Sequence, residues 1–590
     1  MQVFKRGKWD LSQLVKDPES PQFTNQIRYI ESRVKMFEKN KKILSPKISE
    51  NKFNALLHDL EEITEKFSII SGYASLEYSL DTQSDKATSL LIRMRKLGAE
   101  IENRTLFFDQ WWKRQLDEKN AQRLMKSSGE LYEFLRYKRL LAKYSLTEPE
   151  EKIINTLDVT GHSALVRLYD KITNAFEFIV KIDGKVKKCN REEITLLVRS
   201  PRPKVREVAY KALFSQYDKN KGVLGEIYQN IVQNWKDECI QIRGYSSPIS
   251  VRNIGNDVDD KTVNSLLSVC KRNTDVFRSF FQQKAKIMNM KKLRRYDIYA
   301  PVEKKEEKRY NYENAVKLIL DTLHSFSPEL WQHAKKVFVE KHVDSIIRPG
   351  KRSGAFCSTI TPKMTPYVLV NFKGKTNDVF TLAHEVGHAI HSMAASDKSI
   401  FIAEAPLPLA ETASTFSEML LFNKILDKVS DKERLPILVG HIDDLYATIG
   451  RQAYFTVFEV AAHSKIGDGA TVQDISTEYM KTLQQQFGNS VTITPDFGIE
   501  WSCIPHFYHS PFYCYSYSFG NLLSLSLFQR YRKEGSGFVS TYVDILSAGG
   551  SKKPEDLLRE HGIDISSENF WQEGFEYIKT QTERLGKLIN

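Results

Sequence analysis

The sequence predicts a mainly α-helical protein in which β-structure is confined to short stretches. The first reason is the helical period: up to about residue 175, apolar residues recur three and four positions apart, as in "NKFNALLHDLEEITEKFSII" at 51–70. The second is that the period changes to two, as in strands, only in "FEFIVKIDGKVKK" at 176–188 and "PYVLVNF" at 366–372. A chain of 590 residues is long enough to bury one very large core or two to three ordinary ones.

The first of these strand-like stretches is predicted to form a β-hairpin, because Asp183 and Gly184 at its centre make a favoured two-residue turn. Helical patterns resume after it, and "SPRPKV" at 200–205 is the clearest loop signal in this half of the chain. We therefore place a domain boundary near residue 200. Residues 1–200 are expected to form an N-terminal helical lobe with a hairpin near 176–188, and residues 201–590 a second domain.

The composition is typical of a soluble globular protein, with 41% hydrophobic and 27% charged residues. No apolar run reaches the roughly 18 residues of a membrane-spanning helix, and the opening stretch lacks the apolar segment of a signal peptide. The six cysteines are scattered, which favours free thiols in a cytoplasmic protein. We interpret the net charge of +12 as a diffuse surface excess, with no nucleic-acid partner and no membrane contact; a polyanion partner is the alternative.

After the second strand-like stretch comes "TLAHEVGHAIHSMA" at 381–394, whose start residues 376–378 could cap a helix. On a helix, His384 and His388 lie one turn apart on the same face, as two imidazoles must to reach one Zn²⁺ at about 2.0–2.1 Å. Glu385 projects beside them, where it can take a proton from a metal-bound water, the role of the glutamate in an HExxH motif. The alternative is a core helix with satisfied histidines.

A third metal ligand must come from another segment. His391 is separated from residue 384 by about 10 Å of helical rise, so we expect it to pack or to line a channel. The next predicted helix carries Glu411, which we assign as a ligand, and Glu418, which we expect to orient a ligand. The small residues from 410 to 414 would let this helix approach the first one closely. The alternative for Glu411 is a helix-start acid favoured by the macrodipole.

An aromatic segment, "HFYHSPFYCYSYSFG" at 506–520, holds more polar-tipped rings than an ordinary core run. A hydrolase that acts through a tetrahedral intermediate needs hydrogen-bond donors for the developing oxyanion, and phenol hydroxyls and imidazoles supply them. The alternative is a half-buried segment whose hydroxyls face water. We expect Tyr515 to be the donor, with Tyr508 and Tyr513 as alternates, and His506 or His509 to share the task.

The order of these motifs resembles a known family. "SGAFCSTI", "PYVLVNF", "TLAHEVGHAIH", "ETASTFSEM", the aromatic segment and "LSAGGSKKPEDLLREHGID" follow one another as in oligoendopeptidase F, a branch of the thimet oligopeptidase group of zinc metallopeptidases. The resemblance covers most of the chain and is strongest from about 350 to 565. It implies a large, two-lobed helical fold that encloses a deep substrate channel, with a small β-sheet beside the histidine helix.

The resemblance also implies the roles of individual residues. Carried over by position, one Zn²⁺ per chain is held by His384, His388 and Glu411, and Glu385 is the general base. The aromatic segment is shorter than in the thimet branch, so the residue that meets the oxyanion stays open. We expect Tyr515 and His506 to be catalytic together with Glu385, and the substrate-binding residues to be Tyr508, His509, Tyr513, Gly354 and Ala355.

We therefore predict a cytoplasmic zinc-dependent endopeptidase that cleaves internal bonds of short unstructured peptides, with residues 201–590 as its catalytic domain. The stretch "PYVLVNF" is expected to pair with the substrate backbone as an added strand. Within enzymes, the alternative is a zinc carboxypeptidase or dipeptide-releasing peptidase. Outside enzymes, it is a basic peptide- or nucleic-acid-binding protein. The cleavage preference, the natural substrates and the oligomeric state stay open.

Overall fold

The computed structural model describes residues 4–302 and 309–589. This part of the chain divides into two compact units, each assembled from three separate stretches of sequence. The first unit contains residues 4–143, 309–427 and 530–562, and the second contains residues 144–302, 428–529 and 563–589. The predicted boundary near residue 200 lies inside the second unit, so the compact units do not follow it.

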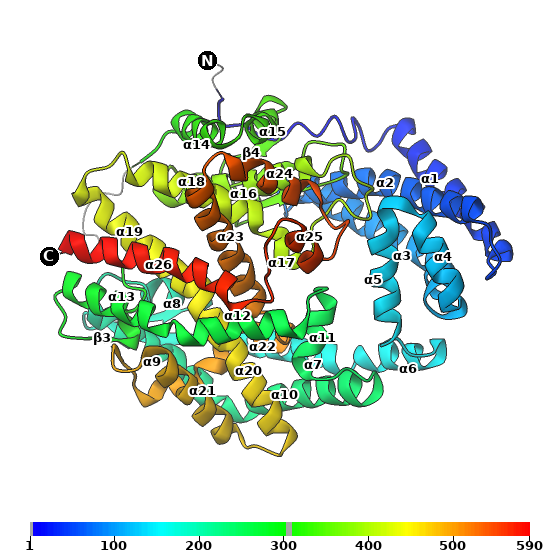
Figure 1. The fold of residues 1–590 in the computed structure, drawn as a ribbon. Helices are drawn as coiled ribbons and strands as arrows, with labels where there is room; N and C mark the ends of the chain where they lie inside the picture. Colours follow the sequence, from blue (N-terminus) through cyan, green and yellow to red (C-terminus); the bar gives the residue numbers. More distant parts are fainter. Residues whose placement is uncertain (1–3, 303–308, 590) are drawn as a thin grey trace. The chain divides into compact units, whose positions relative to one another are not determined.

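The first unit is mainly helical, in agreement with the predicted fold class (Figure 1). Short 3₁₀ or π segments follow some of its helices, at Asn40–Ile43, Trp111–Gln115 and Gly129–Leu131. Its helices and strands are α1 (Pro21–Lys39), α2 (Glu50–Leu80), α3 (Asp85–Gln110), α4 (Glu118–Ser127), α5 (Tyr132–Ala142), α14 (Tyr312–Phe326), α15 (Pro328–Val339), β4 (Val343–Asp344), β5 (Phe356–Ser358), β6 (Tyr367–Leu369), α16 (Thr376–Ala394), α17 (Leu407–Ala410), α18 (Thr412–Leu426), α24 (Gly537–Ser547) and α25 (Pro554–Glu560).

The second unit is also mainly helical. Helix α23 (Tyr515–Glu534) begins in this unit and continues past its last residue in this stretch, 529. The other helices and strands are α6 (Glu148–Asp158), α7 (His162–Asn174), β1 (Phe178–Ile182), β2 (Lys185–Cys189), α8 (Arg191–Leu197), α9 (Pro203–Lys219), α10 (Lys221–Trp235), α11 (Pro248–Gly255), α12 (Asp260–Arg272), α13 (Thr274–Ile287), β3 (Leu293–Arg294), α19 (Asp431–Leu445), α20 (Arg451–Gly467), α21 (Val472–Phe487), β7 (Val491–Thr492), α22 (His506–His509) and α26 (Glu568–Ile589). Short 3₁₀ or π segments lie at Lys236–Ile242, Arg295–Asp297, Tyr446–Gly450 and Pro495–Cys503.

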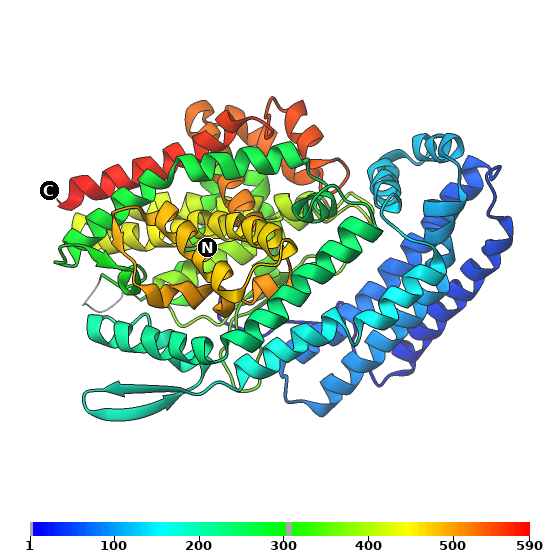
Figure 2. The same ribbon diagram turned by 90° about the horizontal axis from the view of Figure 1, so that it is seen from below.

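The helix predicted over 51–70 is confirmed as part of α2, which packs against α1 and α3 in the first unit (Figure 2, blue). The apolar stripe of α2 buries Phe53, which stacks on Trp112 with ring centroids 5.3 Å apart. Burying such aromatic side chains removes a large apolar area from water, which holds these long helices together. This core continues to the small sheet, because Trp9 donates its indole N–H to the Val368 carbonyl over 2.7 Å.

The strand predicted at 366–372 is confirmed as β6, but its expected role in substrate pairing is wrong. β6 is the central strand of its sheet: it pairs in parallel with β4 and antiparallel with β5. Both of its backbone edges are therefore occupied, and it has no free hydrogen-bonding edge for a substrate. β5 is the terminal strand on this side, and helix α16 packs against both β5 and β6.

The predicted hairpin is confirmed in the second unit. Strands β1 and β2 pair antiparallel from Phe178 opposite Cys189 to Ile182 opposite Lys185 (Figure 2, cyan). The turn residues Asp183 and Gly184 have φ angles of 51° and 78°. Positive φ at both central positions is what a type I′ turn requires, and Asp-Gly is a pair that adopts it readily.

All six cysteines are free thiols, as expected. Within 4–302 and 309–589, none of the helices combines the length and the apolar character needed to span a bilayer.

Candidate metal centre

Helix α16 presents the HExxH residues from the first unit. The Asp378 carboxylate accepts the backbone N–H groups of Lys373 and Lys375 over 2.6 and 3.0 Å, which fixes the entry of the chain into the helix. An acidic side chain in the first turn also complements the helix dipole. The continuous helical turn then places His384 and His388 on one face, as predicted.

Glu411 lies at a break between two helices. The single helix predicted to carry Glu411 is divided into α17 and α18, and Glu411 stands between them with φ −85° and ψ 0°. The close approach of the two segments is confirmed at Gly387 of α16. A Cβ atom there would lie 2.5 Å from Ser414 Cα and 2.7 Å from the Ala413 carbonyl oxygen. Only glycine at this position lets α18 come close enough for Glu411 to reach the histidines.

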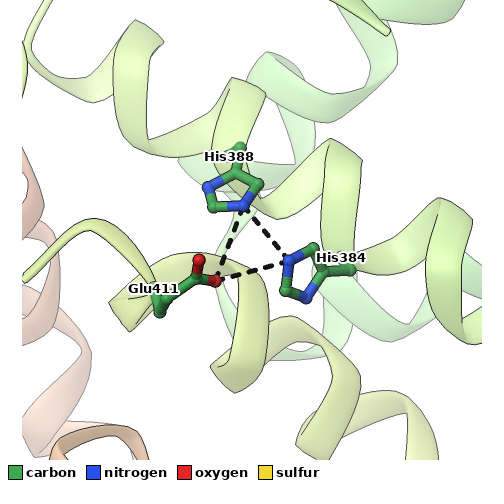
Figure 3. Close-up of side chains that lie close together, drawn as sticks. All are labelled: His384, His388 and Glu411. Carbon is green, nitrogen blue, oxygen red and sulfur yellow. Dashed lines mark hydrogen bonds and ion pairs between the residues drawn. The ribbon is translucent and has the colours of Figure 1, made fainter. Parts of the chain in front are cut away.

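The three predicted ligand residues come together (Figure 3). His384 Nε2 lies 3.2 Å from His388 Nε2, and Glu411 Oε2 lies 3.3 Å from the first and 3.6 Å from the second. Tetrahedral Zn²⁺ with bonds of about 2.0–2.1 Å would set its ligand atoms roughly 3.3 Å apart. The donor set of two imidazoles and one carboxylate therefore fits a zinc ion, with one position left open. Among the described residues, His391 is not part of this cluster.

Neighbouring groups fix the orientation of both imidazoles. The Nδ1 atom of His384 contacts Oε1 of Glu418, and the Ala410 carbonyl accepts a hydrogen bond from His388. Such partners hold a ligand ring with its other nitrogen toward the metal. Burial opposes protonation of His384, but the Glu418 and Glu411 carboxylates outweigh it and raise the pKa of His384 to about 9. Burial lowers the pKa of His388.

Glu385 is buried beside the ligands and faces strand β5. The Cys357 backbone N–H donates to its carboxylate, so the sheet fixes the direction of this side chain. Burial, together with the charges of Glu411 and Glu418, raises the pKa of Glu385 to about 7, and His384 acts in the opposite direction. A carboxylate with this pKa can both take up and release a proton near neutral pH.

His391 is buried, which agrees with the expected packing or wall position. Its ring donates to the same Ala410 carbonyl that accepts from His388, and burial lowers its pKa to about 4. His391 therefore supports the segment before Glu411 and lines the neighbouring pocket.

A pocket of about 370 Å³ adjoins Glu385 and His388 in the first unit. Ala355, a predicted substrate-binding residue, lines it, whereas Gly354 is exposed and its carbonyl accepts a hydrogen bond from Asn371 over 2.9 Å. The rest of the wall was not predicted from the sequence, because it depends on the pairing of β5 with β6 and on the loop between α16 and α17. The wall residues in full are Ala355, Phe356, Cys357, Thr359, Glu385, His388, His391, Ser392, Ala403, Glu404, Ala405 and Ala410.

The aromatic segment lies in the second unit, and two of its tyrosines are fully buried there. The Tyr515 hydroxyl accepts a hydrogen bond from Asn256 Nδ2 over 2.8 Å. Tyr508 stacks on Tyr169 with ring centroids 3.8 Å apart, and its hydroxyl donates to the Leu224 carbonyl. Neither position favours contact with a substrate, so the expected roles of Tyr515 and Tyr508 gain no support from their surroundings.

Other side chains of the same segment are more accessible. His506, Tyr513 and Tyr517 are half-buried; the rings of Tyr513 and Tyr517 meet edge to face at 5.3 Å, and His506 Nε2 lies 3.3 Å from the Tyr517 hydroxyl. His509 is exposed and pairs with Asp170 over 2.8 Å. A pocket of about 330 Å³ is lined by His506, His509 and Tyr513, which are three of the expected site residues.

Curated relatives match this chain over much of its length. An oligoendopeptidase F homolog of Borreliella burgdorferi is 28% identical over 606 aligned positions, which cover 100% of this chain and 99% of the relative. The oligopeptidase PepF of Bacillus subtilis is 27% identical, over 75% of this chain and 67% of the relative.

Solved structures share the fold. A Chlamydophila abortus protein superimposes with a TM-score of 0.88 at 24% identity and covers 100% of both chains. Oligoendopeptidase-F from Enterococcus faecium superimposes with a TM-score of 0.69 at 19% identity, over 96% of this chain and 99% of that one. The family model of peptidase family M3 matches residues 196–577, a range that contains the metal ligands and the aromatic segment. Because this match spans more than half of the sequence, the chain belongs to peptidase family M3.

Proposed function

We propose that this metalloendopeptidase of family M3 is a zinc enzyme that hydrolyses internal bonds of short unstructured peptides. The observation that supports the proposal most directly is the His384, His388 and Glu411 cluster with Glu385 beside it. The relatives named oligoendopeptidase F and oligopeptidase support the class of substrate.

In this proposal, His384 Nε2, His388 Nε2 and Glu411 Oε2 hold the metal, and Glu418 and Ala410 hold the imidazoles in place. When bound, zinc supplies a Lewis acid that polarises a carbonyl and lowers the pKa of water. Glu385 takes a proton from the attacking water on its carboxylate and returns it to the leaving amine. The hydrogen bond from the Cys357 N–H keeps that carboxylate turned toward the pocket.

Strand β5 replaces β6 as the proposed strand that pairs with the substrate. It is the terminal strand of its sheet, and its residues Phe356 and Cys357 line the pocket beside Glu385. A peptide added along a terminal strand is held mainly through backbone hydrogen bonds, so many sequences bind. Gly354 and Ala355, which directly precede this strand, remain proposed substrate contacts.

For the oxyanion donor, we propose a hydroxyl of Tyr513 or Tyr517 in place of Tyr515, with His506 as its neighbour. These side chains are half-buried, and the Tyr515 hydroxyl is engaged with Asn256 inside the second unit. His509 remains a proposed substrate contact; it lines the pocket of about 330 Å³ that His506 and Tyr513 also line. The variants Tyr513→Phe and Tyr517→Phe should differ in kcat. The donor is the tyrosine whose replacement lowers kcat by about 10²- to 10³-fold.

The cytoplasm is the proposed location, and the free thiols of all six cysteines support a reducing compartment. The proposed partners are short peptides.

The function is tested with a peptide blocked at both ends and carrying an internal fluorophore and quencher pair. The chain should cleave it, contain about one zinc per chain by metal analysis, lose activity with a chelator and regain it with Zn²⁺. Cleavage that requires a free C-terminus would favour the carboxypeptidase alternative. Absence of any metal-dependent cleavage would contradict the proposal.

The ligand assignment is tested by titrating zinc into two variants. Glu411→Ala should weaken zinc binding far more than Glu418→Ala, because only Glu411 is proposed to touch the metal, and losing a partner of a ligand usually costs about 10- to 100-fold. The reverse order would move the third ligand to Glu418.

A further inference from the structure

The pocket beside Glu385 and His388 has an unusual distribution of charge. Of the described residues that line it, Glu385 and Glu404 carry carboxylates, and none is lysine or arginine. This contrasts with the whole chain, which has a formal net charge of +12. The Arg352 guanidinium lies over the Phe356 ring, 5.2 Å from its centroid, but Arg352 itself does not line the pocket. A positively charged group that enters the pocket therefore meets carboxylates, and neither lysine nor arginine, on the part of its walls that the structure describes. Because Glu385 is the proposed base and His388 a proposed zinc ligand, Glu404 is the carboxylate left to pair with such a group.

Glu404 is held at the pocket by a fixed backbone. The loop that carries it connects α16 to α17, and the Gly550 N–H donates to the Ile402 carbonyl over 2.7 Å. A Cβ atom on Gly550 would lie 2.7 Å from the Glu404 carbonyl oxygen, and one on Gly549 would lie 2.6 Å from the Ile402 carbonyl oxygen. The glycine pair thus anchors this loop, while the Glu404 side chain is exposed at the pocket.

The other walls suit an extended aliphatic chain. Small side chains form much of the lining, and the two hydroxyls present, Thr359 and Ser392, bond to each other over 2.6 Å. The volume of about 370 Å³ is near the lower end of the roughly 300–1,000 Å³ typical of ligand pockets. This is enough room for a long side chain but not for a folded peptide. Because Glu385 and His388 form one wall, the pocket serves a residue next to the bond being cleaved.

We propose that this pocket binds a cationic group of the substrate and that Glu404 is the residue that selects for it. The inference rests on the proposed peptidase function and adds the class of substrate: peptides with lysine or arginine beside the scissile bond. An arginine or lysine stem would lie along the small residues, with its charge at Glu404.

The test uses peptides of one sequence that differ only at the two positions flanking the cleaved bond. Arginine is compared with citrulline, which has nearly the same shape and no charge, and with glutamate. Each peptide is made with a free and with an acetylated N-terminus. The expected result is a ratio of kcat/KM for arginine over citrulline of about 2- to 5-fold at one of the two positions, the range for an accessible ion pair.

Variants then assign the preference to one residue. Glu404→Gln should abolish the arginine-to-citrulline ratio, and Glu404→Lys should invert the preference in favour of glutamate. Glu102→Lys, an exposed position on α3 outside the pocket, changes the net charge equally and should leave the ratio as in the parent. The parent ratio should also fall toward one at high salt, because salt screens accessible charges.

The outcomes are distinguishable from failure of the proposed function. If the parent cleaves none of the peptides, the peptidase proposal itself fails. If it cleaves them but does not distinguish arginine from citrulline, or if Glu404→Lys leaves the preference unchanged, the inference about Glu404 is overturned. A preference that follows the free N-terminus and not the side chain would also overturn it, because an α-ammonium group beside the cleaved bond means removal of the N-terminal residue and not cleavage of an internal bond.

Discussion

Glu385 stands next to a metal ligand in the sequence, yet its carboxylate accepts a hydrogen bond from strand β5. Glu385→Gln should therefore keep the metal and lose turnover, because an amide can still accept the Cys357 N–H but cannot take a proton. We expect kcat to fall by at least about 10²- to 10⁴-fold, the usual worth of a positioned acid or base. Metal analysis and steady-state kinetics on the same sample check this. A variant that holds zinc and turns over like the parent would rule out Glu385 as the base.

A second buried carboxylate, Glu459 of α20, supports the aromatic segment. Its Oε1 accepts the Phe512 N–H over 2.8 Å, and Phe512 has a φ of 59°, a value in the left-handed region that side chains rarely adopt. Burial raises the pKa of Glu459 to about 8. The folded state therefore favours the protonated acid, and the stability that this provides is lost as the pH rises from the ordinary pKa of about 4.3 to the folded value.

Glu459→Gln should remove this dependence of the folding stability on pH, because glutamine resembles the protonated acid and still accepts the Phe512 N–H. The melting temperature of the variant relative to the parent should increase between pH 5 and pH 9, as measured by parallel thermal unfolding at each pH. If the difference in melting temperature between variant and parent were the same from pH 5 to pH 9, Glu459 would have an ordinary pKa in the folded protein.

The tyrosines of the aromatic segment show what a local sequence pattern can and cannot predict. Tyr513, Tyr515 and Tyr517 occupy every second position of this segment, and each combines an apolar ring with a polar hydroxyl. Which one faces the interior depends on where α23 begins and on the packing of Asn256, which is remote in sequence. In contrast, His384 and His388 were predictable, because their positions relative to each other depend only on the helical turn.

At the scale of elements, the metal centre depends on how closely α16 and α18 approach. Gly387→Ala should push the two helices apart, because the new methyl group would meet the backbone of Ser414 and Ala413 at 2.5 and 2.7 Å. Backbone atoms cannot move aside as a side chain can, so Glu411 would be displaced from the histidines. We expect a lower melting temperature and weaker zinc binding, measured by calorimetric titration.

The matched control is Gly440→Ala on α19, where the added Cβ would have no neighbour within 4 Å apart from the adjacent residues and the nearby backbone of its own helix. Alanine is the better helix former, so this variant should be neutral or slightly more stable. If Gly387→Ala binds zinc like the parent, the close approach of α16 and α18 is not what positions Glu411.

Elements defined by local pattern were predicted, and those defined by long-range pairing were not. The hairpin follows from the Asp183-Gly184 turn, and α2 from its apolar period. The stretch at 366–372 was predicted as a strand, but its position as the central strand of the sheet was not. That position depends on the pairing of both Val343 and Cys357 with Val368. No local pattern contains that information, because each partner strand has only two or three residues.

At the scale of the whole molecule, the chain enters each compact unit more than once. A boundary near residue 200 was predicted from loop composition, which marks where a chain can turn but not which distant segments it will join. The proposed metal ligands nevertheless all belong to one unit, since residues 384, 388 and 411 lie within 309–427. Metal binding should therefore stabilise that unit directly, by the linkage of ligand binding to folding.

Chelation of the metal should accordingly have a local effect. Without the metal, the carboxylates of Glu385, Glu411 and Glu418 are left close together, and the segments that carry them should open more often. We expect faster amide hydrogen exchange in α16, α17 and α18, and unchanged exchange in α20, α21 and α26 of the second unit. Hydrogen exchange with mass spectrometry, with and without chelator, measures this, and re-addition of Zn²⁺ is the control. An equal increase throughout both units would mean that the metal stabilises the fold as a whole and that the first unit does not respond separately.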